Sequence, residues 1–346
     1  MSVFLYAPLL TALSIILLRP IANALDLIDV PNQRKQHYGD VPLTGGISVF
    51  IAFTFVLISQ GFFEPATTQN QVFYMCFMFI IFIGVLDDMY ELSVITRLIG
   101  QLLVSTLFVF GTDSYILNLG VLWGTDVINI SSTLGLILTV LAIMAAMNIF
   151  NMIDGMDSVL GTVSIVSLTV LASLFYVAGN DFHFTVSASL VLILLSFLAF
   201  NIFPIARFQY KTFMGDAGSM LIGLLMIWLL IEGSQGQESS VAFSPIMALY
   251  IIGLPLMDMV AIIIRRIFRN ASPFKADHEH IHHLLVRSGK STKSAKVIIP
   301  ILSALIIGCG LAINSLAPVY MFTGFLILFT SYMVFTNTLI KKIKSK

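Results

Sequence analysis

Apolar stretches of membrane-span length recur along this chain from one end to the other. A helix needs roughly 20 apolar residues to cross the hydrocarbon core of a bilayer. Eleven such stretches lie near 2–22, 44–63, 71–86, 96–111, 133–150, 158–178, 183–203, 217–232, 244–264, 297–317 and 319–340. Only 10% of the 346 residues are charged, against about a quarter in soluble domains. The sequence therefore predicts an all-α, polytopic integral membrane protein with about eleven transmembrane helices in a single domain, 1–346.

The basic residues predict how these helices are oriented. All 18 Lys and Arg residues fall in alternate connections, in the C-terminal tail, or, for Arg19 and Arg97, at the end of a stretch that borders one of those connections. The intervening connections, 61–70, 111–132, 178–182, 232–243 and the turn near 318, contain none. Because cytoplasmic loops retain Lys and Arg, we expect an odd number of spans, with the N-terminus outside and the C-terminus in the cytoplasm.

Charge and cysteine content exclude other classes of protein. The formal net charge is zero, which argues against a general nucleic-acid-binding protein. Cys76 and Cys309 each lie within an apolar stretch, so neither a disulfide framework nor a thiolate metal site is expected. The lipid bilayer is the partner that the composition predicts.

Two adjacent acids, Asp87 and Asp88, follow the third apolar stretch on the predicted cytoplasmic side. Neighbouring carboxylates repel each other unless a cation lies beside them. Oxygen ligands without cysteine favour Mg²⁺, with Mn²⁺ as the alternative. The pair is interpreted either as a metal site or as an ordinary acidic loop at the membrane surface.

The segment "NIFNMIDGMD" ends the fifth apolar stretch with four polar residues spaced three apart: Asn148, Asn151, Asp154 and Asp157. An unbroken α-helix would point the first and last of them in opposite directions. We therefore expect a break at Gly155, which would let Asp154 and Asp157 face a ligand. The alternative is a helix cap followed by an Asp-Gly turn.

Asp216 stands between two glycines in "KTFMGDAGSM", at the start of the eighth apolar stretch. An aspartate in that place is often a helix N-cap. Close backbone approach at the glycines, with Lys211 nearby, also suits a phosphate or metal site.

Histidines gather in "SPFKADHEHIHHLLVRSGK", where His280, His282 and His283 lie among lysines and arginines. Imidazoles bind Zn²⁺ when neutral, and they bind phosphate or act as general acids when they carry donor protons. The basic neighbours favour an anion site, while a polar interfacial loop remains the alternative.

Two further features have strong structural explanations. Lys35 and His37 lie in the first cytoplasmic loop, where a positive-inside anchor explains the charges almost as well as phosphate binding does. Asp258 lies well inside the ninth stretch, about 10 Å of helix from Arg265. An acid at that depth is either functional or held by a buried hydrogen bond.

The four motifs occur together in a known family. Their order and topology resemble those of the polyprenyl-phosphate N-acetylhexosamine-1-phosphate transferases. The four motifs are Asp87-Asp88 after an apolar run, "NIFNMIDGMD", "FMGDAGS" and "HIHH". The resemblance covers nearly the whole chain, and "DVPNQRKQHYGDVPLTGGISV", "PLMDMVAI" and "SPFKADHEHIHHLL" are similar to the branch that uses UDP-GlcNAc. The related muramoyl-pentapeptide transferases carry three adjacent histidines instead.

The resemblance implies transfer of GlcNAc-1-phosphate from UDP-GlcNAc to undecaprenyl phosphate at the cytoplasmic face of a bacterial inner membrane. This would be the first lipid-linked step of O-antigen or related surface polysaccharide synthesis. Another UDP-N-acetylhexosamine remains open as donor, and a homodimer is one option for the oligomeric state. A less favoured alternative from the sequence is an ion-coupled transporter, whose sites usually lie near the midplane within repeats.

The motifs and the resemblance together give expected roles for individual residues. The candidate catalytic residues are Asp87, Asp88, Asp154, Asp157 and His280. The candidate substrate-binding residues are Asn148, Asn151, Lys35, His37, Lys211, His282 and His283. The candidate metal ligands are Asp87, Asp88 and Asp216. One departure is Ser158, which stands where the family usually has glycine, so the geometry of that turn is in question.

Overall fold

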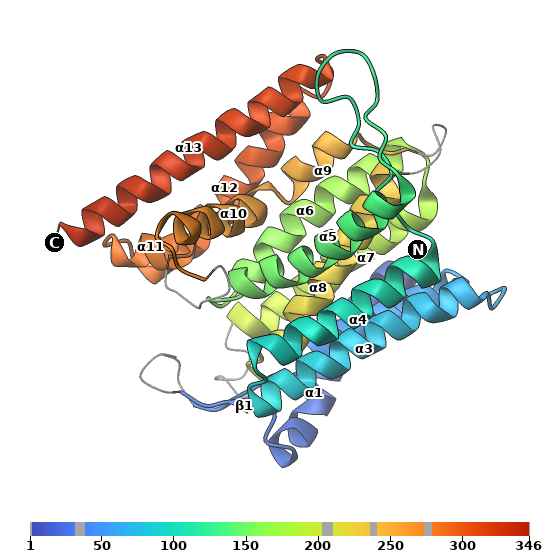
Figure 1. Ribbon diagram of the computed structural model, residues 1–346. Helices are drawn as coiled ribbons and strands as arrows, with labels where there is room; N and C mark the ends of the chain where they lie inside the picture. The colour runs from blue at the N-terminus through green and yellow to red at the C-terminus, as the bar shows by residue number, and fades with distance from the viewer. Residues whose placement is uncertain (1, 32–38, 203–209, 236–240, 273–278, 346) are drawn as a thin grey trace.

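The computed structural model describes residues 2–31, 39–202, 210–235, 241–272 and 279–345. Its helices run side by side in a bundle, with the N-terminus at one end and the C-terminus at the other (Figure 1). Termini at opposite ends are what an odd number of crossings requires.

The helices are named in chain order. They are α1 Ser2–Ala24, α2 Gly45–Ser59, α3 Thr68–Tyr90, α4 Val94–Thr112, α5 Ser132–Ile153, α6 Val159–Val177, α7 Asp181–Ile202, α8 Gly215–Ser234, α9 Pro245–Ile251, α10 Gly253–Phe268, α11 Ile281–Arg287, α12 Thr292–Ala312 and α13 Pro318–Lys344. Two short antiparallel strands, β1 Ile28–Asp29 and β2 Val41–Pro42, join α1 to α2.

The all-α, multi-pass membrane class is confirmed. Nine helices in the described parts of the chain are long and apolar enough to cross a membrane. The pair α9–α10 makes a tenth candidate if it is counted as one span, although it bends by 82°. The remaining predicted stretch, 44–63, contains α2, which is shorter at 15 residues. The total of eleven spans and the side that faces the cytoplasm stay predictions.

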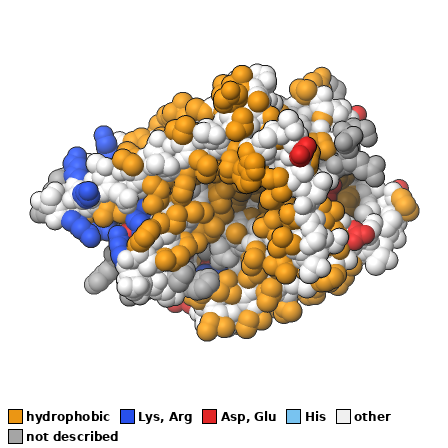
Figure 2. Space-filling view, turned by 45° about the horizontal axis from the view of Figure 1, so that its top comes forward, with side chains coloured by type: hydrophobic (Ala, Val, Ile, Leu, Met, Phe, Trp, Pro, Cys, Tyr) orange, Lys and Arg blue, Asp and Glu red, His pale blue; other side chains and the backbone are white. Residues whose placement is uncertain are grey.

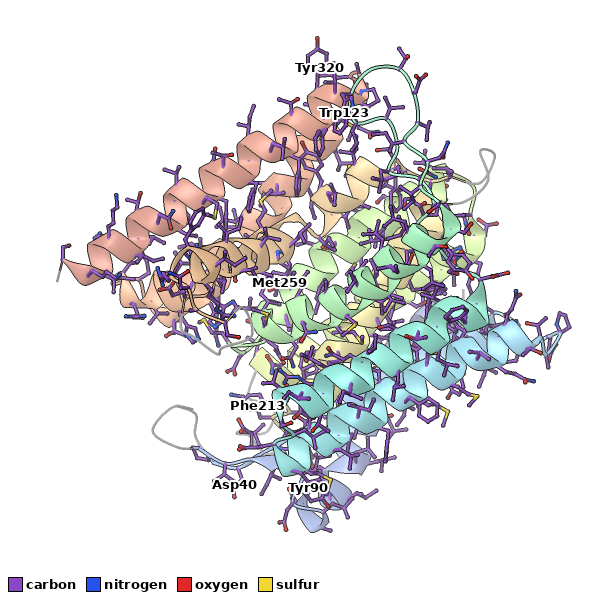
Figure 3. The ribbon with its side chains drawn as sticks, viewed as in Figure 1. Asp40, Tyr90, Trp123, Phe213, Met259 and Tyr320 are labelled. Carbon is purple, nitrogen blue, oxygen red and sulfur yellow. The ribbon has the colours of Figure 1, made fainter. Side chains whose placement is uncertain are left out.

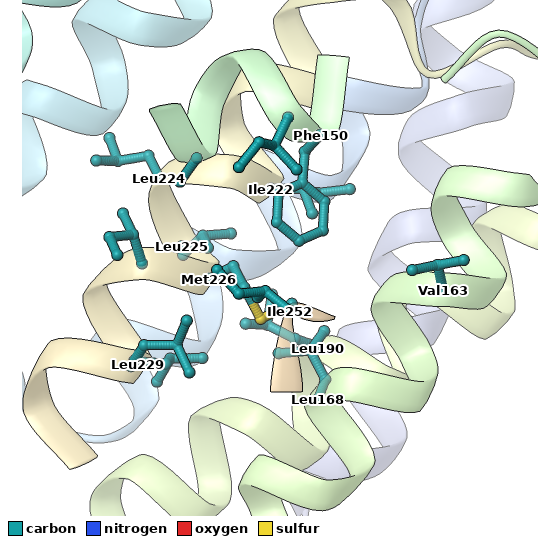
Figure 4. Packing of buried hydrophobic residues seen from close by; sticks show 14 of the residues in the cluster. Phe150, Val163, Leu168, Leu190, Ile222, Leu224, Leu225, Met226, Leu229 and Ile252 are labelled. Carbon is teal, nitrogen blue, oxygen red and sulfur yellow. The ribbon is translucent and has the colours of Figure 1, made fainter. Parts of the chain in front are cut away.

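Helix α8 forms the centre of the bundle. Every residue from Ala217 to Ile231 is buried, which is what an α-helix that is apolar on all sides requires. It packs mainly against α2, α3 and α5. Figure 4 shows Leu224, Leu225 and Met226 of α8 among side chains from neighbouring helices.

The outer surface is apolar around the middle of the molecule. Large apolar side chains of α1, α4 and α13 are exposed there, as expected of helices that face lipid. In Figure 2, Lys and Arg side chains gather at one end of the visible face, and apolar side chains cover its middle. The last turn of α13 carries three lysines, Lys341, Lys342 and Lys344.

The break predicted at Gly155 is confirmed. Helix α5 ends at Ile153, and α6 begins at Val159, so no straight helix runs through Asp157. The last helical residue lies two positions before Gly155, and Asp154 caps the helix. The strained residue of the turn is Ser158, whose φ of +71° lies in the left-handed region that glycine tolerates best.

Candidate functional site

The start of α8 is fixed by backbone hydrogen bonds to the N-terminal part of the chain. The Phe213 N–H donates to the Pro42 carbonyl at 3.1 Å, and the Gly45 N–H donates to the Phe213 carbonyl at 2.9 Å. Figure 3 places Phe213 at the same end of the bundle as Asp40 and Tyr90. These contacts hold Asp216, on the first turn of α8, beside the end of α3.

Asp88 binds the N-terminus of α8. Its Oδ1 accepts the Asp216 N–H at 2.7 Å, and its Oδ2 accepts the Ala217 N–H at 3.2 Å. The first N–H groups of a helix lack partners within the helix, so a carboxylate from another helix is well placed there. Gly215 has a φ of +73°, and a Cβ on it would lie only 2.5 Å from the Asp88 carboxylate.

Asp87 faces a different partner from Asp88, because successive helical residues point about 100° apart. Its carboxylate accepts the Leu92 N–H at 2.9 Å and lies 3.2 Å from the Arg97 guanidinium. From the sequence, Arg97 was used only as one of the basic residues that predict the orientation of the helices. The spacing of ten residues across the α3–α4 turn was the signal that could have paired it with Asp87.

The two asparagines of α5 point to different places. The Asn151 amide donates to Asp216 Oδ1 at 2.6 Å and to Ser219 Oγ at 3.0 Å, so it orients the candidate metal ligand. The Asn148 amide donates to Gln101 Oε1 at 2.6 Å and to the Met144 carbonyl at 2.8 Å. The structure thus brings Asn151 to the carboxylates and places Asn148 one turn deeper, between α4 and α5.

Asp154 and Asp157 occupy the turn between α5 and α6. Burial raises the pKa of the Asp154 carboxyl well above its usual range, and the nearby negative charges of Asp216, Asp88 and Asp157 raise it further. Asp157 Oδ2 instead lies 3.1 Å from Lys211 Nζ and 3.4 Å from Lys296 Nζ.

Lys296, in the second turn of α12, is a site residue that the sequence did not predict. A positive-inside count treats every lysine of a cytoplasmic loop alike, and it does not say which of them turns inward. The signal that could have found it is its position at the start of an apolar helix, on the same side as Lys211.

The histidine motif reaches the same turn. A Cβ on Gly155 would lie 2.2 Å from His282 Nε2, so the absence of a side chain at Gly155 makes room for the imidazole. The His282 and His283 rings have centroids 4.1 Å apart. His280 is buried, and its Nδ1 lies 2.9 Å from Asp258 Oδ2. Lys35 and His37 lie outside the described residues.

The carboxylates fit a hard divalent cation in their chemistry. Asp88, Asp154 and Asp216 interact electrostatically at one end of the bundle, and such a cluster needs protons or a cation to offset its repulsion. Among the residues that the structure describes, no three His, Cys, Asp or Glu side chains are arranged to hold a metal. Arg97 and the α8 N–H groups engage Asp87 and Asp88 instead.

Known proteins match most of the length of this chain. The family model for glycosyl transferase family 4 matches residues 70–234, from α3 to α8. The undecaprenyl-phosphate alpha-N-acetylglucosaminyl 1-phosphate transferase of Haemophilus influenzae is 38% identical over 328 residues, which cover 93% of this chain and 89% of the relative. The enzymes of the same name from Salmonella typhi and Escherichia coli K12 are each 36% identical, over 89% of this chain and 81% of their own length.

The chain belongs to glycosyl transferase family 4. Enzymes of this family generally depend on a divalent metal. The family predicted from the order of the motifs is thus confirmed, and the transporter alternative loses its support. The family 4 match includes the aspartates on α3, on the α5–α6 turn and on α8. The histidine motif lies beyond residue 234, in the part of the chain that the match to the Haemophilus influenzae enzyme covers.

Proposed function

We propose that this family 4 enzyme transfers GlcNAc-1-phosphate from UDP-GlcNAc to undecaprenyl phosphate, forming undecaprenyl-diphosphate-GlcNAc and UMP. The observation that carries the proposal is the gathering of Asp88, Asp154 and Asp216 from three segments at one end of the bundle. The shared name of the relatives supports the acceptor and the sugar. The basic residues that cluster in alternate connections support a site that faces the cytoplasm, where nucleotide sugars are made.

The carboxylates are the proposed ligands of the divalent cation. Asp88 and Asp216 lie close together, with Asp87 next in sequence, and all three offer oxygen donors. Mg²⁺ is proposed, with Mn²⁺ as the alternative. When bound, such a cation neutralises charge on the diphosphate and on the leaving phosphate. Asn151 orients Asp216 through its 2.6 Å hydrogen bond.

The basic side chains would bind the phosphates. Lys211 and Lys296 both pair with Asp157, so a diphosphate entering the site would compete for these cations. His280 would accept a hydrogen bond from a hydroxyl or amide N–H group of the nucleotide sugar through its imidazole. The uridine portion is assigned to the α5–α6 turn with Asp154, where His282 closes the other side.

We propose direct, in-line transfer. The lipid phosphate oxygen attacks the phosphorus attached to the sugar, and the bond from that phosphorus to UMP breaks. A phosphate monoester has a second pKa of about 6, so the acceptor is largely dianionic at neutral pH and needs no general base. The aspartates therefore act as ligands and positioning groups. A phospho-aspartate formed from UDP-GlcNAc without lipid acceptor would refute this mechanism.

The test measures UMP release and lipid-linked sugar with purified protein, UDP-GlcNAc, undecaprenyl phosphate and either Mg²⁺ or Mn²⁺. UDP-GalNAc and UDP-glucose serve as competing donors. Asp88→Asn should abolish turnover, whereas Asp181→Asn, an exposed acid at the start of α7, should leave it unchanged. Equal turnover of wild type and Asp88→Asn would remove Asp88 from the site, and a preference for another donor would replace GlcNAc. Restoration of surface polysaccharide in a strain that lacks the relative's activity tests the pathway.

A further inference from the structure

Asp258 lies on α10, next to Met259 (Figure 3), and its buried carboxylate accepts three hydrogen bonds. Oδ1 accepts the Tyr332 O–H at 2.6 Å and the Ile281 N–H at 3.1 Å. Oδ2 faces His280 Nδ1 at 2.9 Å. The acid that the sequence placed inside a span therefore belongs to a network that ends at the histidine motif.

The network determines which nitrogen of His280 carries a proton. A carboxylate has only acceptor oxygens, so the ring nitrogen that faces Oδ2 must be the donor. The Nδ1–H tautomer follows, because the partner of one imidazole nitrogen sets the state of the other. Nε2 then carries no proton and can only accept a hydrogen bond, so its partner on a substrate must be a hydroxyl or amide N–H group and not a phosphate oxygen.

The backbone beside His280 is tied to the same helix. Arg265 of α10 donates to the Glu279 carbonyl at 3.2 Å, and its Nε lies 3.3 Å from the Glu279 carboxylate. Arg269, one turn later, lies 2.6 Å from the other Glu279 oxygen. The residues before and after His280 are thus both bonded to α10, which fixes the position of the ring as well as its tautomer.

We propose that Asp258, supported by Tyr332, is a positioning residue that holds His280 as the Nδ1–H tautomer and presents Nε2 as a hydrogen-bond acceptor to a hydroxyl or amide N–H group of the nucleotide sugar. The inference rests on the proposed function for the task of His280. Its structural part, the tautomer, stands on the Asp258 contacts alone. Asp258 acts through His280 and does not touch substrate.

Asp258→Asn is the sharpest perturbation, because the neighbouring donors determine how the new amide must turn. The Tyr332 O–H and the Ile281 N–H both need an acceptor, so the amide oxygen takes the place of Oδ1. The amide nitrogen then replaces Oδ2 and donates to Nδ1 of His280. That exchange forces the Nε2–H tautomer with almost no change in side-chain volume.

A double-mutant cycle tests whether Asp258 acts through His280. Outer partners that orient a functional histidine typically contribute about 10–100-fold, so Asp258→Asn should lower kcat by that factor with KM for UDP-GlcNAc within about twofold. In a His280→Asn background, the same substitution should change kcat by less than about twofold. Losses that multiply in the double variant would show a general structural role and overturn the inference.

The tautomer is also measured without turnover. Nitrogen-15 NMR of histidine-labelled protein distinguishes Nδ1–H from Nε2–H rings, and His280→Asn identifies the signal. The expected result is Nδ1–H in the wild type and Nε2–H in Asp258→Asn. An Nε2–H ring in the wild type, or an unchanged ring in the variant, would overturn the inference. If the wild type has the Nδ1–H ring but His280→Asn turns over normally, the tautomer stands and the proposed task of His280 is refuted.

Matched variants separate this network from helix packing. Tyr332→Phe removes one of the three hydrogen bonds to Asp258 and should lower kcat by a smaller factor than Asp258→Asn. Thr336→Val removes the nearby contact of α13 to Arg265, at 3.1 Å, while leaving the Asp258 network in place. Its kcat should stay near that of the wild type; a loss as large as that of Asp258→Asn would attribute both effects to the α10–α13 interface.

Discussion

Gly84→Ala tests whether the α3–α8 contact sets the geometry of the carboxylates. A Cβ on Gly84 would lie 2.2 Å from the Ala217 Cα and 2.5 Å from its nitrogen. These are backbone atoms, so they cannot rotate away. Ordinary contact begins at 3.4 Å, and the two helices must therefore separate locally by about 1.2 Å. Asp88 is one helical turn from Gly84, and it accepts the Ala217 N–H and the Asp216 N–H.

The separation should affect stability and turnover unequally. Overpacking of this kind costs about 1–3 kcal/mol of folding free energy, which leaves many proteins folded. A displacement of about 1 Å in a reacting site can cost about 10²-fold in rate. Gly84→Ala should accordingly insert normally, show a lower thermal midpoint and lose about 100-fold in kcat.

Gly308→Ala is the matched control on another helix. A Cβ on Gly308 of α12 would meet no atom within 4 Å, so turnover should be unchanged. Alanine also favours the helix over glycine by about 0.5–1 kcal/mol. The assay measures UMP release by both variants beside their thermal midpoints in detergent. A kcat of Gly84→Ala within threefold of the control would refute the claim that this contact positions the site.

Three other predictions follow from single contacts. Ser158→Gly should raise folding stability by about 0.5–1 kcal/mol, because it relieves a left-handed conformation at φ +71°; thermal unfolding measures it, and an unchanged or lower midpoint would contradict it. Asn151→Ala should lower kcat by about 10–100-fold through Asp216, whereas Asn148→Ala should mainly lower stability; equal kcat losses in the UMP assay would contradict the distinction. Without added cation, the free energy of unfolding should fall as the pH rises above 3.8, the ordinary pKa of an aspartate, because the raised pKa of Asp154 makes the folded state hold its proton more tightly. Thermal midpoints measured from pH 4 to 8 test this, and Asp154→Asn should reduce their dependence on pH.

The apolar stretches predicted the helices well because lipid requires every backbone group to be bonded within the segment. They did not predict the 82° bend at Ile252, since an interrupted span has the same mean hydropathy as a straight one. Gly253 and Pro255 were the local signals there. The two-residue strands β1 and β2 were also missed, because nothing in their length or pattern distinguishes them from a loop.

The candidate site was predictable in its acids and less so in its partners. Asp88 and Asp216 stood out because charge is rare in this chain, yet their contact depends on how α3 and α8 pack. Lys296 and Arg97 were hidden among residues that explain topology equally well. Asn148 and Asn151 looked equivalent in sequence, and only the helix rotation separates the one that bonds Asp216 from the one that bonds Gln101.

The enclosure of α8 has a consequence for how a lipid substrate reaches this enzyme. From Ala217 to Ile231 no part of the helix faces the bilayer, although its first turn carries Asp216. An acceptor dissolved in the membrane therefore cannot reach that aspartate by moving sideways along α8. Its phosphate must pass between the surrounding helix ends at the membrane surface, while its hydrocarbon chain stays outside. Changes in bilayer thickness or lipid type should consequently act on the entry of the acceptor before they disturb the position of the donor.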